Sequence, residues 1–163
     1  MFISNHLIGF GAVEKNSVLF DRTLGTNIGN MTQSGGLASI FDGNTNQDNT
    51  ASGWHNVSPA YAGKTLAAKA AVDRVVTYGC NNFGYSSGAN GTITLTLYGK
   101  NGSVPASATD GTSLGSTSFT DTDVANSKTI ISNDNGTEYD HVWVSNAGVT
   151  NLFFAELQFY LMQ

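Results

Sequence analysis

Residues 92–98 alternate polar and apolar side chains without a break, and this pattern limits the fold more than any other. Threonines stand at positions 92, 94 and 96, and Ile93, Leu95 and Leu97 lie between them. Successive side chains of a β-strand point to opposite faces, so the segment predicts a strand with one buried face. Residues 99–102 follow with the composition of a turn.

Shorter apolar stretches continue this pattern through the rest of the chain. The further predicted strands are residues 18–20, 72–78, 114–119, 127–132, 137–144 and 151–161. The alanine-rich residues 66–71 permit one helical turn, which is too short to be stable alone. With roughly six to eight short strands and no long amphipathic helix, the sequence predicts an all-β protein, a jelly-roll β-sandwich.

Composition agrees with one sandwich domain and excludes several functions. Hydrophobic residues make up 40% of the 163 residues, enough for a core, and the 19 glycines suit many turns. A formal net charge of −5 argues against nucleic-acid binding, which needs a basic patch. No apolar run is long enough to cross a bilayer, so we expect no membrane insertion. The first residues lack a basic region and a cleavage site, so we expect no signal peptide.

Residues 41–50 form a loop crowded with oxygen-bearing side chains. The residues whose side-chain oxygens could bind a cation are Asp42, Asn44, Asn46, Asp48 and Thr50. Far along the chain, Glu156 follows Ala155 inside an apolar closing strand. Calcium binds about six to eight oxygens, which a loop and a distant carboxylate can supply. An EF-hand is excluded because Gln47 and Gly53 stand where it needs Gly and Glu. The alternative is that Asp42 caps a turn and Glu156 faces solvent.

Several loop residues have the chemistry of a sugar site. Such sites set aromatic faces against sugar C–H groups and add a few polar partners for the hydroxyls. The candidate carbohydrate-binding residues are Trp54, His55, Tyr61, Asn81, Asn82, Phe83 and Tyr85. The alternative for each aromatic is core packing or contact with another subunit. Trp143 lies on a predicted strand and is expected to be buried.

Catalytic patterns are absent from the sequence. His6, His55 and His141 are too few and too scattered for a metal triad. There is no Gly-x-Ser-x-Gly elbow and no phosphate-binding loop before a helix. A carboxylate pair for glycoside hydrolysis stays open, although Asp121 and Asp123 lie in a turn where we expect them to be solvated. We therefore expect that the protein is not an enzyme.

Six segments stand in the order of a known domain family. They are residues 41–44 with Trp54, 75–79, 93–102, 114–117, 141–144 and 155–160. Together they resemble the discoidin-like, or galactose-binding-like, jelly roll. That group includes coagulation-factor type C domains and many bacterial carbohydrate-binding modules. The resemblance covers about residues 37–161.

The resemblance implies a division of the chain and a metal site. Residues 37–163 would form the galactose-binding-like jelly-roll domain, and residues 1–36 would be an N-terminal segment that docks to a particle or partner. A structural Ca²⁺ that pins the loop would be the cofactor. Its ligands would come from Asp42, Asn44, Asp48, Thr50, Ala155 and Glu156.

The sequence of these segments is especially similar to those of small jelly-roll proteins of tailed phages and of alphaproteobacterial gene transfer agents. Those resemble head spikes or fibres that attach a particle to cell-surface polysaccharide. The similarity implies a non-catalytic carbohydrate-binding virion protein, assembled in the bacterial cytoplasm as a homo-oligomer among other virion proteins. Two alternatives remain: a structural virion protein without sugar affinity, and a free-standing lectin module.

Overall fold

The computed structural model describes residues 15–56, 58–86, 91–121, 126–134, 136–147 and 150–163. Nearly all regular structure in these residues is β-strand, which confirms the predicted all-β class. The only helix there, α1 (Gly36–Ser39), has four residues. Within the described ranges, no helix reaches the length and hydropathy that a bilayer crossing demands.

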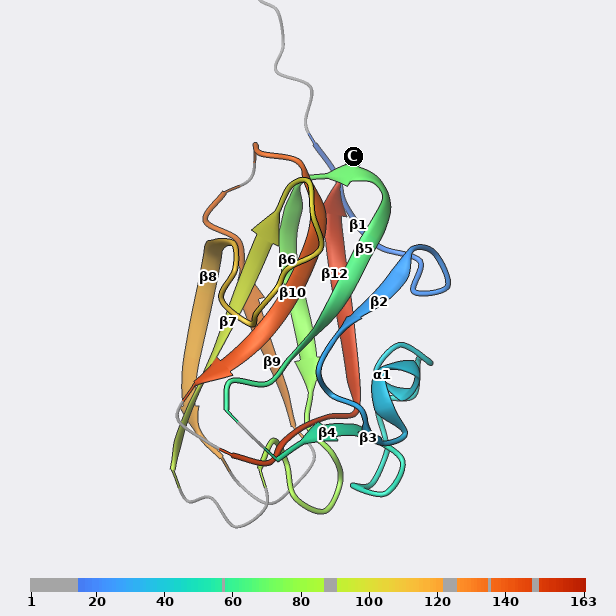
Figure 1. Cartoon of the computed structure of the whole chain (residues 1–163), viewed down its shortest axis with the longest axis vertical. Coiled ribbons are helices and arrows are strands. Elements are labelled where there is room, and N and C mark those ends of the chain that lie inside the picture. Colours follow the sequence, from blue (N-terminus) through green and yellow to red (C-terminus); the bar gives the residue numbers. More distant parts are fainter. Residues whose placement is uncertain (1–14, 57, 87–90, 122–125, 135, 148–149) are drawn as a thin grey trace, which may run out of the picture.

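Two antiparallel sheets pack face to face as a jelly-roll sandwich, as predicted (Figure 1). The four-stranded sheet has the order β1 (Ser17–Leu19), β12 (Glu156–Met162), β6 (Val72–Tyr78) and β9 (Ser127–Ile131). The five-stranded sheet has the order β2 (Thr26–Gly29), β5 (Tyr61–Ala70), β10 (Tyr139–Ala147), β7 (Thr92–Lys100) and β8 (Thr112–Thr120).

The core lies between the sheets and follows the alternation in the sequence. Ile93, Leu95 and Leu97 of β7 are fully buried, while the threonines between them are not. Val75 and Phe159 of the opposite sheet belong to the same cluster. Burial of these apolar faces is the main favourable contribution to folding.

The alanine-rich residues 66–71 do not form a helical turn. They belong mostly to β5, which pairs with β10 on one side and β2 on the other. The β5 ladder with β10 includes residues 61–65 and Ala70, so the strand continues through this segment, and it outweighs the helix preference of alanine, which is small per residue. The prediction for this segment was therefore wrong.

A third, small sheet closes one end of the sandwich. Its strands are β11 (Leu152–Phe154), β4 (Gly53–His55) and β3 (Gln33–Ser34), in that order. Figure 1 shows this sheet at the lower end of the molecule, with the C-terminus at the upper end.

The described part of the predicted docking segment, residues 1–36, is built into the sandwich. β1 pairs with β12, β2 with β5, and β3 with β4. These strands therefore belong to the same folded unit as residues 37–163. Whether residues 1–36 also dock to a partner stays a prediction, and residues 1–14 lie outside the described residues.

Candidate functional site

The small sheet at the lower end brings two aromatic residues together. Trp54 on β4 stands directly opposite Phe153 on β11 and Gln33 on β3. Because side chains alternate along a strand, these three share one face of the sheet. The other face carries Leu152 and Phe154, which belong to the core, so the Trp54 face points away from it.

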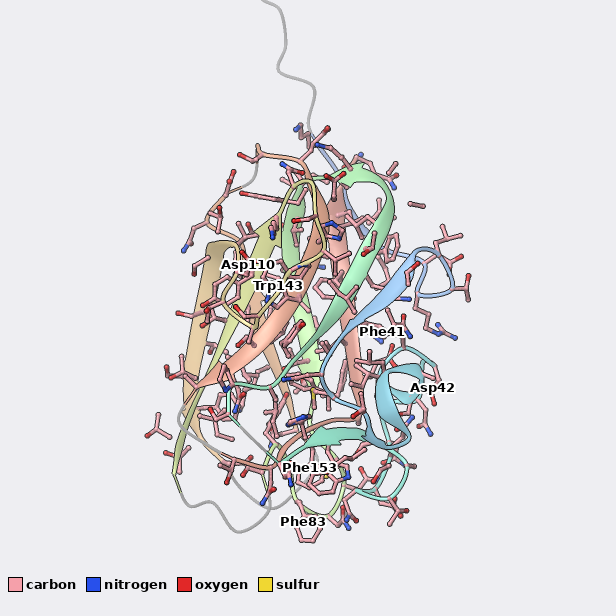
Figure 2. All side chains as sticks on the ribbon, viewed as in Figure 1. Phe41, Asp42, Phe83, Asp110, Trp143 and Phe153 are labelled. Carbon is pink, nitrogen blue, oxygen red and sulfur yellow. The ribbon has the colours of Figure 1, made fainter. Side chains whose placement is uncertain are left out.

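A tight hairpin adds a third aromatic residue. Cys80 and Gly84 form an antiparallel bridge with two backbone hydrogen bonds of 2.7 and 3.0 Å, which leaves residues 81–83 at the tip. Phe83 then lies beside Phe153 with 5.9 Å between ring centroids, and Trp54 stacks on Phe153 at 5.5 Å. Figure 2 shows Phe83 and Phe153 together at this end of the molecule.

We call Trp54, Phe83 and Phe153 the aromatic cluster. Phe153 is 4% exposed, whereas Trp54 and Phe83 are half-buried. Phe153 therefore supports the other two rings, and these keep surface that a ligand can reach. The Trp54 indole is fixed further because Nε1 donates a 2.7 Å hydrogen bond to Ser34 Oγ. Fixed aromatic faces of this kind suit stacking against sugar C–H groups.

Polar groups surround the aromatic cluster. Asn82 Nδ2 donates to Asn49 Oδ1 at 2.7 Å, and Asn49 N donates to Asn82 Oδ1 at 3.0 Å, which clasps the hairpin to the 42–50 loop. Gln33 Oε1 and Asn81 Oδ1 are buried and accept no hydrogen bond within the described residues. Both oxygens lack accessible surface, so in this arrangement they do not offer acceptors to a ligand.

Asp121 holds the end of the hairpin in place through hydrogen bonds. It is 2% exposed, and its carboxylate accepts hydrogen bonds from Tyr85 N at 3.0 Å and Ser86 N at 2.7 Å. The expectation of a solvated turn was therefore wrong for Asp121, because two backbone donors draw its side chain inward. Its predicted companion Asp123 lies outside the described residues.

Tyr85 and His55 do not join the aromatic cluster. Tyr85 is fully buried and donates to the Thr77 carbonyl oxygen at 2.7 Å, and burial raises the pKa of its phenol. A side chain without exposed surface offers no face to a sugar, so the predicted sugar contact of Tyr85 is corrected to a core role. His55 follows Trp54 on β4, so alternation sets it on the opposite, core-facing side.

Tyr61 begins β5 and belongs to the five-stranded sheet, not to the small one. Its neighbour Ala62 is in the core, so Tyr61 projects from the outer face. Its role in sugar binding stays a prediction. Sequence reasoning missed Phe153 and Gln33. The run Leu152-Phe153-Phe154 held the signal for the first, since three consecutive apolar residues in a strand cannot all face one core.

The predicted meeting of the early loop with Glu156 takes place. Glu156 is 1% exposed, and its Oε2 accepts a 2.9 Å hydrogen bond from Gly43 N. Burial raises the pKa of Glu156 to about 7, and the neighbouring charge of Asp42 acts in the same direction. The Gly43 N–H and the positive charges of Arg22 and Lys64 act in the opposite direction.

The other predicted calcium ligands do not converge on Glu156. Asp48 Oδ1 accepts hydrogen bonds from Thr50 N, Thr50 Oγ1 and Ala51 N, all within its own turn. Asn44 Oδ1 accepts from Asn46 N at 3.0 Å. Among the described residues, no three His, Cys, Asp or Glu side chains gather as a possible metal site. Calcium binding therefore stays a prediction.

The raised pKa of Glu156 gives a prediction about pH. Its folded-state pKa of about 7 exceeds the ordinary value of 4.5, so the folded protein binds the proton more tightly. Stability contributed by the protonated form is fully present below about pH 4.5 and is lost as pH rises through about 7, by about 3 kcal/mol. Glu156→Gln keeps an acceptor for Gly43 N and should remove this fall. Urea unfolding of both proteins across this range measures the difference, and parallel curves would contradict it.

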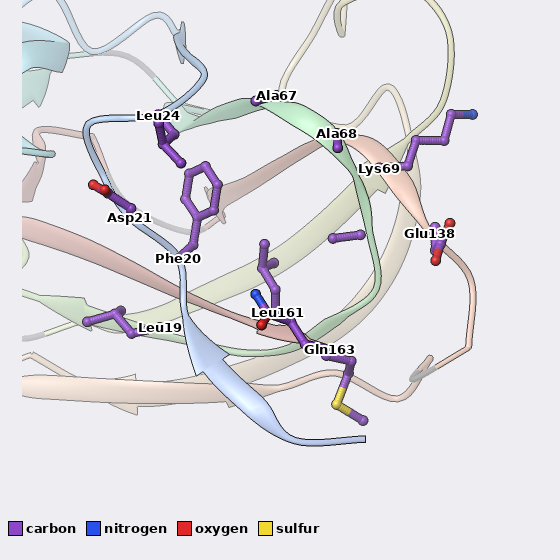
Figure 3. Close-up of a pocket in the computed structure, with 12 residues that line it drawn as sticks. Leu19, Phe20, Asp21, Leu24, Ala67, Ala68, Lys69, Glu138, Leu161 and Gln163 are labelled. Atoms are coloured by element: carbon purple, nitrogen blue, oxygen red, sulfur yellow. The ribbon is translucent and has the colours of Figure 1, made fainter. Parts of the chain in front are cut away.

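A separate pocket lies away from the aromatic cluster. It has a volume of about 420 Å³ and is lined by apolar residues of β1, β5 and β12 and of the segment after β1, among them Leu19, Phe20, Leu24 and Leu161. Figure 3 shows these residues around a common opening. Leu19 is 48% exposed and Leu24 50%. The pocket contains none of the predicted sugar or metal residues.

The fold is that of known sugar-binding domains. The structure is similar to the family 32 carbohydrate-binding module of C. perfringens NanJ in complex with galactose, with a TM-score of 0.63, 14% identity, and 89% of this chain and 99% of that chain covered. It is similar to a fucolectin from striped bass (Morone saxatilis) serum, with a TM-score of 0.68, 14% identity, and 90% and 49% covered.

A third similar structure is a Streptococcus pneumoniae fucose-binding module, SpX-3, with a TM-score of 0.55, 15% identity, and 87% and 98% covered. No protein family and no curated protein matches the sequence. At these identities the likeness establishes the discoidin-like, galactose-binding-like fold alone.

Proposed function

We propose that the protein is a non-catalytic carbohydrate-binding domain whose sugar site is the aromatic cluster. The observation that carries this proposal is the stacking of Trp54 on Phe153, with Phe83 alongside, at a loop-rich end of the sandwich. Two ring faces remain partly open, and the exposed side chain of Asn82 lies on the same hairpin tip as Phe83. Rings for C–H groups and acceptors for hydroxyls are the two elements that a sugar requires.

The comparisons support this proposal through the fold. The similar structures include a module in complex with galactose and a fucose-binding module. The proposed ligand of this chain is therefore a neutral sugar unit of a larger glycan. The sequence resemblance extends the proposal: the glycan would be host-surface polysaccharide, and the protein a head spike, fibre or decoration of a phage-like particle. Weak single-site binding would then be multiplied by display in many copies.

Trp54→Ala tests the proposal. Loss of the exposed indole face should weaken binding to a responsive glycan roughly tenfold or more, which is about 1.4 kcal/mol. The free energy of unfolding should fall by less than about 2 kcal/mol, because the ring is only half-buried. A glycan array finds the ligand, and calorimetry then measures its Kd with wild type, Trp54→Ala and Phe83→Ala.

Tyr160→Ala is the matched control. Tyr160 is also a half-buried aromatic residue, but it lies on β12 with the Arg74 guanidinium 3.9 Å from its ring centroid. Its replacement should leave glycan affinity unchanged. Equal loss of affinity in Trp54→Ala and Tyr160→Ala would remove the aromatic cluster as the site.

A purely structural virion protein is the second candidate function. The observation that favours it is the exposed apolar surface of Leu19 and Leu24, which line the 420 Å³ pocket. Under this alternative, that surface would contact neighbouring subunits, and no glycan would bind. Failure of every array glycan and of host polysaccharide at about millimolar concentration, with assembly intact, would favour it.

A further inference from the structure

Lys64 is a lysine on the core side of its strand. β5 places it between Ala62 and Leu66, and both of these belong to the hydrophobic core. Lys64 is only 3% exposed. A buried ammonium is costly unless it is paired and hydrogen-bonded, so its surroundings must compensate for the lost water.

Three kinds of group compensate the Lys64 ammonium. Its Nζ donates to the carbonyl oxygens of Arg22 at 2.6 Å and Leu24 at 3.3 Å. It also lies 4.6 Å from the ring centroid of Phe41, a cation–π distance. Finally, burial lowers the pKa of Lys64, and the charge of Glu156 opposes this shift in part.

A second cation approaches Glu156 from the same segment. The guanidinium of Arg22 lies directly against Gly43, where a side chain at position 43 would overlap it. Arg22 and Glu156 also line one small cavity of about 20 Å³, enough for about one water molecule. Around Glu156, the two carboxylates of Asp42 and Glu156 therefore face the two cations Arg22 and Lys64.

Calcium does not fit this arrangement. Asp42 Oδ1 accepts from Asn44 N and Oδ2 from Gln47 Nε2, both at 2.7 Å, while Glu156 Oε2 accepts from Gly43 N. Glu156 Oε1 is the oxygen of this pair without a partner in the described residues. A calcium ion needs about six to eight oxygens, and it would meet N–H donors and two positive side chains here.

We propose that Lys64 and Arg22 take the place of a calcium ion, so that the 42–50 loop is fastened to β12 by the protein's own cations. Lys64 contacts the Phe41 ring at the start of the loop from inside the sandwich, and Arg22 covers Gly43 from outside. The Gly43 N–H then joins the loop to the closing strand directly. The fold is therefore independent of calcium at this position.

Calcium addition to wild type is the first test. At about pH 8 Glu156 is mostly ionised, which favours metal binding and makes the test strict. Wild type should melt within about 1 °C of the same temperature in EDTA and in about 5 mM calcium, well above the Kd of about 10⁻⁴–10⁻³ M typical of extracellular calcium modules. Calorimetry should show no calcium binding. A rise of several degrees, with measurable binding heat, would overturn the proposal.

Substitution of Lys64 is the second test. Lys64→Met should lower the melting temperature strongly, and Lys64→Met/Glu156→Gln should recover part of the loss, because the second change removes the unpaired carboxylate. Lys69→Met is the matched control, since Lys69 lies on the same strand with a half-exposed side chain. Should Lys64→Met fail to fold, Arg22→Gln at the exposed position supplies the milder variant. Equal melting of Lys64→Met and Lys69→Met would contradict the pairing.

Discussion

Trp143→Ala should lower the free energy of unfolding by about 3–5 kcal/mol, the cost of emptying a buried tryptophan site. Trp143 has no exposed surface, as expected from the sequence. It nevertheless lies outside the main core, because its neighbours Val142 and Val144 occupy the core face of β10. The indole stacks on Tyr98 at 5.5 Å, and Nε1 donates to the Ala108 carbonyl oxygen at 2.8 Å.

The site has little freedom to collapse around the cavity. Gly111 lies against the indole ring and Gly63 against the Trp143 Cβ, and neither has a side chain that could move in. Urea unfolding measures the loss, and a value below about 1 kcal/mol would contradict this packing. Trp54→Ala makes the same chemical change at the other tryptophan. We expect the first variant to lose stability with its glycan affinity intact, and the second to show the reverse.

Asp121→Ala should lower the free energy of unfolding by about 3 kcal/mol and also weaken glycan binding. Removal of the carboxylate leaves the buried Tyr85 N without an acceptor and leaves Ser86 N only its 3.2 Å bond to the Phe83 carbonyl oxygen, and an unsatisfied donor costs about 1–3 kcal/mol. These two residues end the hairpin that carries Phe83. A displaced hairpin would separate Phe83 from Phe153, so the aromatic cluster would lose one ring.

Asp21→Ala controls for the loss of a carboxylate at the surface. The Asp21 carboxylate accepts hydrogen bonds from Thr23 within its own exposed turn, so its loss should leave the free energy of unfolding and the glycan affinity nearly unchanged. Denaturant unfolding and calorimetry with the array-identified glycan measure both effects. Loss of stability in Asp121→Ala without any change of affinity would show that the hairpin does not position the sugar site.

The sequence predicted those parts of the fold that depend on local alternation. Residues 92–98 were predicted as a half-buried strand, and they lie within β7. The contact between the 42–50 loop and Glu156 was also predicted, and Gly43 N makes it. Residue type and spacing indicate both features, so a single sequence suffices to find them.

The predictions that failed depend on contacts between distant segments. The closing segment changes at Ala155, which separates β11 from β12. Leu152 and Phe154 face the core before this point, and Leu157 and Phe159 face it afterwards, so the parity of inward-facing residues switches. Strict alternation over residues 151–161 cannot show this irregularity. It turns Phe153 outward into the aromatic cluster, where sequence reasoning did not expect it.

Burial of polar residues was equally hidden. Asp121 and Lys64 are polar in sequence, and their inward placement depends on backbone donors and acceptors supplied by other segments. From sequence alone, Tyr85 resembles an exposed loop aromatic. In the structure its hydroxyl donates a hydrogen bond to the carbonyl oxygen of Thr77. Such partners become visible only when the chain is folded, because tertiary contacts decide where a polar group is satisfied.

The pairing of β1 with β12 has a consequence for how the molecule would be held. Asn16 and Gln163 exchange two 3.0 Å backbone hydrogen bonds, so the start of β1 and the end of β12 lie together at one pole of the sandwich. Figures 1 and 2 place that pole opposite Phe83 and Phe153. A scaffold that grips the molecule through either strand would orient Trp54 and its companions outward, toward whatever the scaffold approaches.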